Sequence, residues 1–303
     1  MRHYLKIAVL VSAVIFVAAA GCNNQADEDK NKGDESFRIP DSLLSPKDRF
    51  RLVRDEYHPV KGGVMANKDI VLYYPASQIY DFISRKMFGI AFDSYKFVEE
   101  KIGRPARGKV VCIGAKDMDE YKFLTRKEWW YYGFIKGDTI YFEPYDIMLK
   151  RFDKKSEQTI AQMAFIQKFA QMALREKSNG RIPLWLRESI ASYLAGEGYV
   201  LKIQTPQFRE EFTGFRPTES ELNDYLKSAQ DMGLTRVSFY IAYQMLENLI
   251  DISSMEEIMT FIEKLGEGSS LDDASKEVFG IDYNTLISKI DDFKAVPEKG
   301  WDK

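Results

Sequence analysis

Histidine and cysteine are the scarcest residues of this 303-residue sequence, with two of each. The histidines are His3 and His58, so no two stand four residues apart as they do in helical zinc motifs. A carboxylate without imidazole partners supplies neither the zinc affinity nor the activated water that metal-dependent hydrolysis needs. We therefore expect no metal, no cofactor and no catalytic residue of that kind.

Long hydrophobic runs are also missing. The longest, from Ile7 to Ala20, is about 14 residues, whereas a bilayer-spanning helix needs about 20. It follows a basic start and precedes small residues, which is typical of an export signal over residues 1–22. Ala19-Ala20-Gly21-Cys22 resembles the lipobox of bacterial lipoproteins, which implies a lipid on Cys22 and attachment to a membrane outside the cytoplasm. An ordinary secretory signal or an N-terminal anchor helix is the alternative.

A lipid on Cys22 would leave Cys112 as the only other cysteine, so no intrachain disulfide is expected. Cys112 lies in the apolar stretch 109–113, a pattern that indicates a buried strand. We interpret it as an inert core thiol.

No electrostatic case for nucleic acid exists, because the formal net charge is −3 and no basic stripe is present. A glycine-rich phosphate loop is missing too. Gly196-Glu197-Gly198 lacks a third glycine and follows a predicted helix, so we interpret it as a helix C-cap turn.

Composition divides the chain into segments. Residues 23–36 are almost entirely polar and are expected to form a flexible tether. The folded part is predicted as an N-terminal α/β subdomain (37–158) and a helical subdomain of the same unit (159–293), followed by a tail (294–303).

The segment 159–196 predicts a helical hairpin. One apolar helix runs to about Glu176, a breaker follows at 178–180, and a second helix has Pro183 in its first turn and Gly196 just past its end. Glu188 falls within the apolar arc of the second helix. A carboxylate there is costly unless hydrogen bonds, a cation or a metal compensate it.

The sequence 183–194 resembles the "P-x-W-h-x-E-G-h-A-x-Y-h" helix of the gluzincin zinc peptidases, the peptidase MA family. The resemblance implies that Glu188 corresponds to the third zinc ligand. The other two ligands of that family are the histidines of His-Glu-x-x-His on the preceding helix. Matching the helices places that motif on 165–169, with Phe165 and Phe169 at the histidine positions and Ile166 at the general base. On this alignment hydrocarbon fills the metal site, and convergence of Phe165, Phe169 and Glu188 is the structural test.

The region from 68 to 150 predicts mixed α/β structure. Its strands are expected at 69–74, 109–114 and 137–142, with a helix from about 77 to 102 weakened near Gly89. Amphipathic helices are predicted at 238–250, 255–264, 271–279 and 283–293. The order resembles the same peptidase family over 68–293. It implies an α+β, zincin fold with an edge strand, a central helix hairpin and a C-terminal helical subdomain.

Partner-binding candidates come from two aromatic segments. In the peptidases, the strand corresponding to 139–142 would line the substrate cleft, which makes Tyr141 a candidate for contacting extended peptide. Trp129 and Trp130 form a concentrated aromatic patch. An ordinary edge strand and a core lid are the alternatives for the two segments.

Three functions remain open at this stage. The first is an inactive peptidase-like lipoprotein that binds a peptide or protein partner in the cell envelope. The second is a cell-envelope module that binds a small ligand through the aromatic patch, and the third is a hydrolase with a non-zinc site around Glu188. Fold alone does not decide among them.

Overall fold

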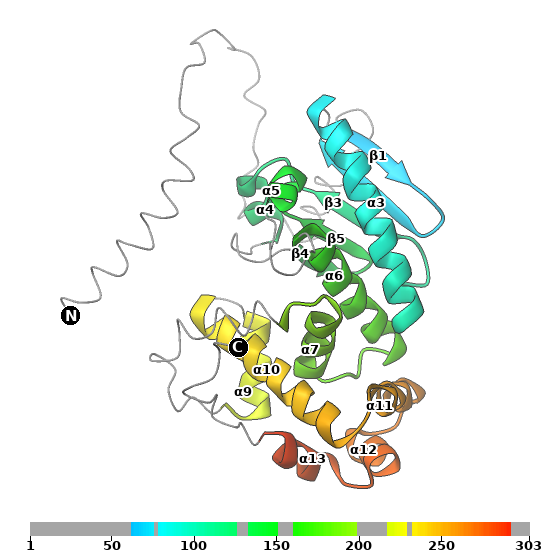
Figure 1. The fold of residues 1–303 in the computed structure, drawn as a ribbon, viewed down its shortest axis with the longest axis vertical. Coiled ribbons are helices and arrows are strands. Elements are labelled where there is room, and N and C mark those ends of the chain that lie inside the picture. Colours follow the sequence, from blue (N-terminus) through cyan, green and yellow to red (C-terminus); the bar gives the residue numbers. More distant parts are fainter. Residues whose placement is uncertain are drawn as a thin grey trace, which may run out of the picture. The chain divides into compact units, whose positions relative to one another are not determined.

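The computed structural model describes residues 62–75, 78–125, 133–150, 160–198, 217–228 and 232–291. By its contacts the chain divides into two units, Met1–Ser45 and Pro46–Lys303, and every described residue belongs to the second. The described chain is α+β, with one mixed sheet followed by a long series of helices (Figure 1).

The sheet has five strands in the spatial order β1-β2-β3-β5-β4. In chain order the strands are β1 (Gly62–Ala66), β2 (Ile70–Pro75), β3 (Val110–Gly114), β4 (Gly133–Lys136) and β5 (Thr139–Phe142). The three central strands are parallel, whereas β1 pairs antiparallel with β2 and β4 pairs antiparallel with β5.

Alternation along the strands separates the two faces of the sheet, because successive side chains point to opposite sides. Cys112, Ile140 and Phe142 belong to the large core shared with the helices. Ile113 and Tyr141 form a smaller cluster on the other face, where Leu124 packs against them. Cys112 is fully buried, as predicted, and burial raises the pKa of its thiol.

Four helices accompany the sheet. They are α3 (Gln78–Lys101), α4 (Met118–Thr125), α5 (Tyr145–Lys150) and α6 (Ile160–Lys177). The long α3 packs against both β2 and α6, and α6 also contacts β4. The helix was expected to be broken or weakened near Gly89, and no break occurs there, because α3 continues through this residue.

The helical hairpin is confirmed. After α6, Asn179 and Gly180 adopt positive φ angles of 51° and 76° and reverse the chain. The second helix, α7 (Leu184–Leu194), has Pro183 as its N-cap, one position earlier than predicted. Gly196 follows with φ of 73°, in the left-handed conformation that a helix end favours.

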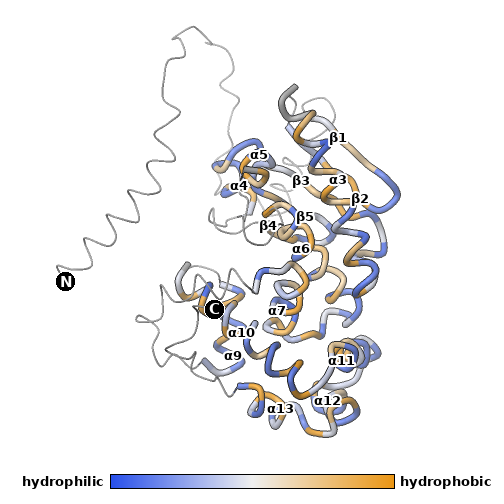
Figure 2. The backbone as a smooth tube through the Cα atoms, viewed as in Figure 1, coloured by the Kyte–Doolittle hydropathy of each residue, from blue (hydrophilic) through white to orange (hydrophobic). Residues whose placement is uncertain are grey.

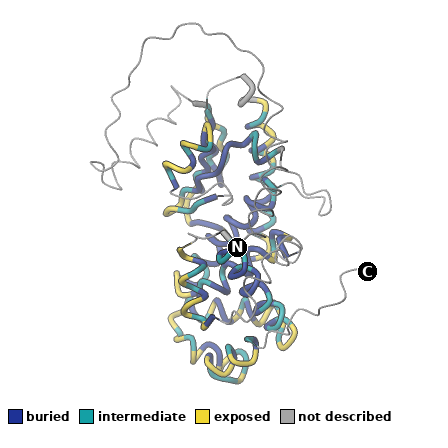
Figure 3. The backbone as a smooth tube through the Cα atoms, turned by 90° about the vertical axis from the view of Figure 1, so that its left-hand side faces the viewer, coloured by how far each residue is buried: buried dark blue, intermediate teal, exposed yellow. Residues whose placement is uncertain are grey.

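The remaining helices are α9 (Glu219–Ser228), α10 (Met232–Ile252), α11 (Met255–Glu267), α12 (Leu271–Phe279) and α13 (Tyr283–Ile290). The last four agree with the predicted amphipathic helices, although α10 begins earlier. Apolar and polar residues alternate along α11 to α13 (Figure 2). In Figure 3 the buried residues lie in the interior, and the exposed residues lie on the outer turns of the helices.

The predicted position of the edge strand is wrong. The segment 139–142 is β5, which pairs with β3 on one side and with β4 on the other. Among the described strands, β4 and β1 end the sheet. Gly137, with φ of 60°, forms the tight turn that carries β4 back along β5.

Several predictions fall outside the described residues. They concern the signal and lipidation site at Cys22, the tether, the tail 294–303 and the aromatic pair Trp129 and Trp130. Among the helices that the structure does describe, none has the length and apolar character to cross a membrane.

Candidate functional site

The polar side chains of α6 mark the candidate site. Nearly all of this helix is buried, and its middle carries Gln167, Lys168 and Gln171 among apolar residues. Their exposed fractions are 6%, 3% and 6%. Gln171 follows Lys168 by three residues and Gln167 by four, spacings that place it on the same side of the helix as each of them. Gln167 and Gln171 face α7 and the turn that ends it, as their hydrogen bonds show.

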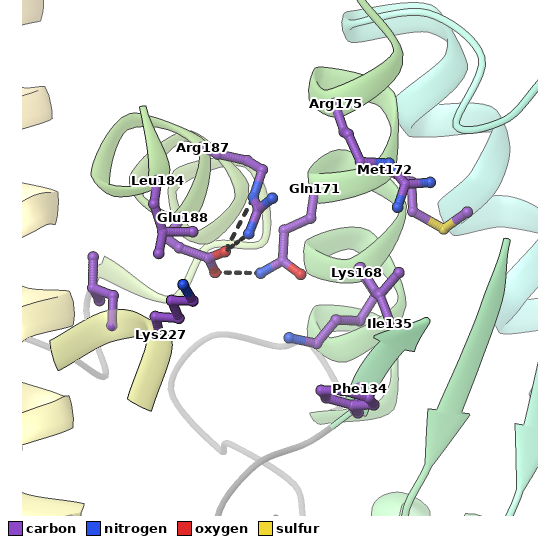
Figure 4. Close-up of a pocket in the computed structure, with 12 residues that line it drawn as sticks. Phe134, Ile135, Lys168, Gln171, Met172, Arg175, Leu184, Arg187, Glu188 and Lys227 are labelled. Atoms are coloured by element: carbon purple, nitrogen blue, oxygen red, sulfur yellow. Dashed lines mark hydrogen bonds and ion pairs between the residues drawn. The ribbon is translucent and has the colours of Figure 1, made fainter. Parts of the chain in front are cut away.

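Glu188 receives two groups of donors. Gln171 donates from Nε2 to Oε2 of Glu188, and Arg187 donates from Nε and Nη2 to Oε1 at 3.2 and 2.8 Å (Figure 4). The buried carboxylate is therefore compensated by an amide from α6 and by the cation beside it on α7. Hydrogen bonds and a cation, two of the three compensations considered for Glu188 from the sequence, are thus both present.

A second contact joins α6 to the end of α7. Gln167 donates from Nε2 to Oε2 of Glu197 at 2.8 Å and lies 3.4 Å from Oγ of Ser192. The turn that ends α7 positions Glu197. Gly196 reverses the backbone, and the N–H of Glu197 then donates to the carbonyl of Ser192. Gln167 and Gln171 of α6 thus each hold one glutamate of the following segment.

Burial raises the pKa of Glu197 to about 7, and the nearby charge of Glu188 adds to the rise. Ser192, Lys168 and Gln167 act in the opposite direction, since their donors and positive charge favour the ionised form. Glu197 is 6% exposed, and its Oε1 has no hydrogen-bond partner among the described residues. This carboxyl group therefore changes its charge near neutral pH.

The structure does not bring Phe165 and Phe169 to Glu188, so this prediction is wrong. The two rings stack on each other with centroids 5.7 Å apart. Phe165 also packs on Phe142 of β5, and Phe169 packs on Tyr95 of α3. Both rings, like the buried Ile166, belong to the main core, whereas the glutamines of the same helix face α7.

A cavity of about 210 Å³ opens between β4, α6, α7 and α9. Gln171 and Glu188 line it, and Figure 4 shows their side chains meeting between the two helices. Its lining is rich in positive charge, with four basic side chains against the single carboxylate of Glu188. These four are Lys168, Arg175, Arg187 and Lys227.

Strand β4 forms one wall of the cavity through Gly133, Phe134 and Ile135. Gly133 packs closely against its neighbours: a Cβ there would come within 3.1 Å of the Phe142 ring and 3.4 Å of Lys168 Cγ, so these side chains would have to shift slightly. The last strand of the sheet and the hairpin of α6 and α7 thus border the same space.

Tyr141 does not face this space. It is 4% exposed and packs with Ile113 on the other face of the sheet, and burial raises its pKa to about 12. The prediction that Tyr141 contacts a partner is therefore wrong. Its position follows from the two-residue period of the strand, which puts its neighbours Ile140 and Phe142 on the side of α6.

Gln167, Lys168 and Gln171 were not predicted as site residues, although the sequence contains a signal for them. Three polar residues in the middle of an otherwise apolar, buried helix require partners, just as Glu188 does on the next helix. As for metals, the described residues contain no group of three or more His, Cys, Asp or Glu side chains arranged to hold an ion.

Compared with models of known protein families, the chain matches none, and no curated protein matches it.

Proposed function

We propose that the chain is an exported, lipid-anchored protein whose folded domain is a gluzincin-like pseudopeptidase that binds an extended peptide segment of a cell-envelope partner. The observation that carries the proposal is the bond from Gln171 of α6 to Glu188 of α7. It places an i, i+4 pair of polar side chains, Gln167 and Gln171, on the side of α6 that faces α7. The family resemblance expects histidines in that arrangement.

On α6 the family motif is therefore aligned two residues later than the sequence alone suggested, on 167–171 instead of 165–169. Gln167-Lys168-x-x-Gln171 stands for His-Glu-x-x-His, and Glu188 keeps the position of the third ligand. Zinc in proteins is bound by Cys, His and carboxylate groups, whereas a glutamine amide is a neutral and weaker ligand. Lys168 replaces the general base with a cation. The proposal therefore assigns no metal, no cofactor and no catalytic residue to this site.

Hydrogen bonds take the place of metal bonds in joining the two helices. Gln171 holds Glu188 and Gln167 holds Glu197, so the hairpin is tied at two levels. Each glutamate accepts a hydrogen bond from one of these amides, which offsets part of the cost of burying the polar layer.

Peptide binding is assigned to β4 because it ends the described sheet beside the cavity. An extended peptide can add to such a strand through main-chain hydrogen bonds. The cavity is also smaller than the roughly 300–1,000 Å³ of pockets that enclose a whole small molecule. Its size favours one group of a larger partner over the alternative of a small-ligand module.

The backbone of Ile135 provides the test. A two-residue hairpin turn is closed by a hydrogen-bonded pair, here Lys136 and Thr139, and such pairs alternate along the strands. The N–H of Ile135 should therefore point away from β5. Ile135→Pro removes this donor and is tolerated on a sheet edge, whereas Ile135→Ala keeps the donor and shortens the side chain.

We expect immobilised wild-type protein to retain peptides from a mixed library of acetylated and amidated pentapeptides rich in Val, Ile, Leu and Thr. Ile135→Pro should lose this retention, and Ile135→Ala should keep most of it. Circular dichroism checks that both variants are folded. Equal retention by wild type and Ile135→Pro would exclude strand addition at β4.

The anchor is tested separately. Because the lipobox-like sequence ends at Cys22, we expect Cys22→Ser to move the protein from the membrane fraction to the aqueous fraction. Detergent phase partitioning of cell lysates measures this. A variant that still partitions with membranes would contradict lipidation at this cysteine.

A further inference from the structure

We propose that the cavity between β4, α6, α7 and α9 binds a carboxylate of the partner peptide, held by Arg175, Arg187 and Lys227. This inference rests on the proposed function, because it names the chemical group that the bound peptide presents. The carboxylate comes from an acidic side chain or from a chain end, and the two sources share the same chemistry.

Charge is the first argument. The whole chain carries three more acidic than basic side chains, yet the cavity lining carries four basic residues and one acidic residue. Carboxylates outside the lining compensate part of this charge: Asp138 lies 3.5 Å from Arg175, and Glu197 lies close enough to Lys168 for their charges to interact. Among the described residues, the three proposed ligands Arg175, Arg187 and Lys227 still outnumber the carboxylates of Glu188 and Asp138. Because Arg175 and Arg187 are half-buried and Lys227 is exposed, this excess positive charge is accessible to an anion.

Unused hydrogen-bond donors are the second argument. A guanidinium has five N–H groups, and Arg187 uses only Nε and Nη2 for Glu188. Arg175 uses only Nη2, for the Gly137 carbonyl and for Asp138. Among the described residues, the Nη1 group of each arginine makes no hydrogen bond or ion pair. Each arginine can therefore still donate to a ligand oxygen.

The three cations come from three helices. Arg175 lies near the end of α6, Arg187 lies in the first turns of α7, and Lys227 lies near the end of α9. Figure 4 shows Arg187 and Lys227 beside Glu188 on one side of the space, with α6 opposite. An anion at the centre would be approached from several directions, which favours a compact group such as a carboxylate over an extended polar chain.

The place of the cavity links it to the peptide. Ile135, whose backbone we assign to strand addition, is itself part of the lining. A peptide paired with β4 would send alternate side chains to one face, and one of them would reach the basic lining. Main-chain bonds to β4 would give general affinity, and the carboxylate would select the sequence.

Three peptide libraries test the inference. Each consists of pentapeptides with mixed Ala, Val, Leu, Ile and Thr around a fixed central residue. The first has central Glu with blocked ends, the second has central Gln with blocked ends, and the third has central Gln with a free C-terminal carboxylate. The protein is the full mature domain, and the readout is retention followed by mass spectrometry.

We expect the Glu library to be retained about tenfold or more above the blocked Gln library, as a charge-assisted hydrogen bond predicts. Lys227→Gln and Arg175→Gln should each reduce this preference several-fold. Lys86→Gln on α3 is the matched control, because it removes the same charge from an exposed position outside the cavity lining. Circular dichroism and urea unfolding establish that each variant is folded.

Each outcome decides a separate point. Preferential retention of the free-carboxylate library would support the same site with a chain end as the source. Equal retention of all libraries would overturn the carboxylate site and leave peptide binding standing. A Glu preference unchanged in both cavity variants would place the anion elsewhere and overturn the inference. Retention of no library at all would contradict peptide binding itself.

Discussion

Glu188 and Glu197 are buried carboxylates with different surroundings. Glu188 has the Arg187 guanidinium and the Gln171 amide as donors. Glu197 has Gln167, but one of its oxygens has no hydrogen-bond partner, and burial outweighs the favourable groups around it. Burial that its hydrogen-bond donors only partly offset therefore raises the pKa of Glu197.

The raised pKa of Glu197 predicts a pH-dependent stability. In the unfolded chain an ordinary glutamate loses its proton near pH 4.3, whereas in the folded protein Glu197 loses it near 7. Between these values the folded state binds more protons, so stability falls as pH rises through this window. Glu197→Gln does not titrate and still presents an oxygen to Gln167.

We therefore expect the difference in unfolding free energy between Glu197→Gln and wild type to shift in favour of the variant as the pH rises from about 5 to about 8. The shift should be on the order of 3 kcal/mol or less. Urea unfolding at the two pH values measures the difference. A difference that does not change with pH would show that this carboxyl group titrates normally in the folded protein.

At the scale of single elements, the boundaries of the helical hairpin were predictable from the sequence. The side of α6 that faces α7 was not. Gly196 and the breaker at 178–180 give clear end signals. Helix α6, which ends at the breaker, is buried on nearly all sides, because α3, β4 and α7 all pack against it. Hydrophobic periodicity cannot identify one inner face when every face is covered. The polar positions Gln167 and Gln171 carry the information instead.

The short strand β4 was missed for a related reason. Gly133–Lys136 is only four residues long and follows an aromatic segment, so it gives almost no alternation to detect. Its neighbour β5 has the stronger pattern, and the family resemblance implied that this strand forms the edge. Strand order depends on pairing between distant segments, which local patterns do not encode.

The N-terminus of α7 is capped by a side chain from another helix, and the contribution of this interaction to stability can be measured. Pro183 offers no side-chain acceptor there, and Asn223 of α9 instead accepts from the backbone N–H of Trp185 at 2.9 Å. Asn223→Ala should cost about 1 kcal/mol, as loss of an N-cap acceptor does. The exposed neighbour Asp224 makes a suitable control, with Asp224→Ala expected to change stability by about 0.5 kcal/mol or less. Equal effects in urea unfolding would contradict a capping function.

At the scale of the whole described chain, α7 connects the sheet layer to the C-terminal helices. It packs against α6 on one side and against α9 and α10 on the other. The Trp185 indole donates to Glu219 of α9 at 3.1 Å, and the Tyr283 hydroxyl of α13 also donates to Glu219. The candidate site lies where the two predicted subdomains meet, because β4 of the first and α6, α7 and α9 of the second line its cavity.

The central claim is that this site is a zinc peptidase site whose ligands were replaced. If so, Gln167→His, Lys168→Glu and Gln171→His together should rebuild the missing groups opposite Glu188. Adding Glu188→Gln to this triple variant removes the third ligand and changes nothing else, which makes it the matched control. Circular dichroism confirms that each protein is folded.

Zinc content measured by elemental analysis after dialysis tests this claim most directly. We expect wild type to hold no stoichiometric zinc, the triple variant to hold about one zinc per chain, and the control with Glu188→Gln to lose most of it. A folded triple variant without zinc would contradict the proposed register and the peptidase ancestry. Stoichiometric zinc in the wild-type protein would contradict the pseudopeptidase account.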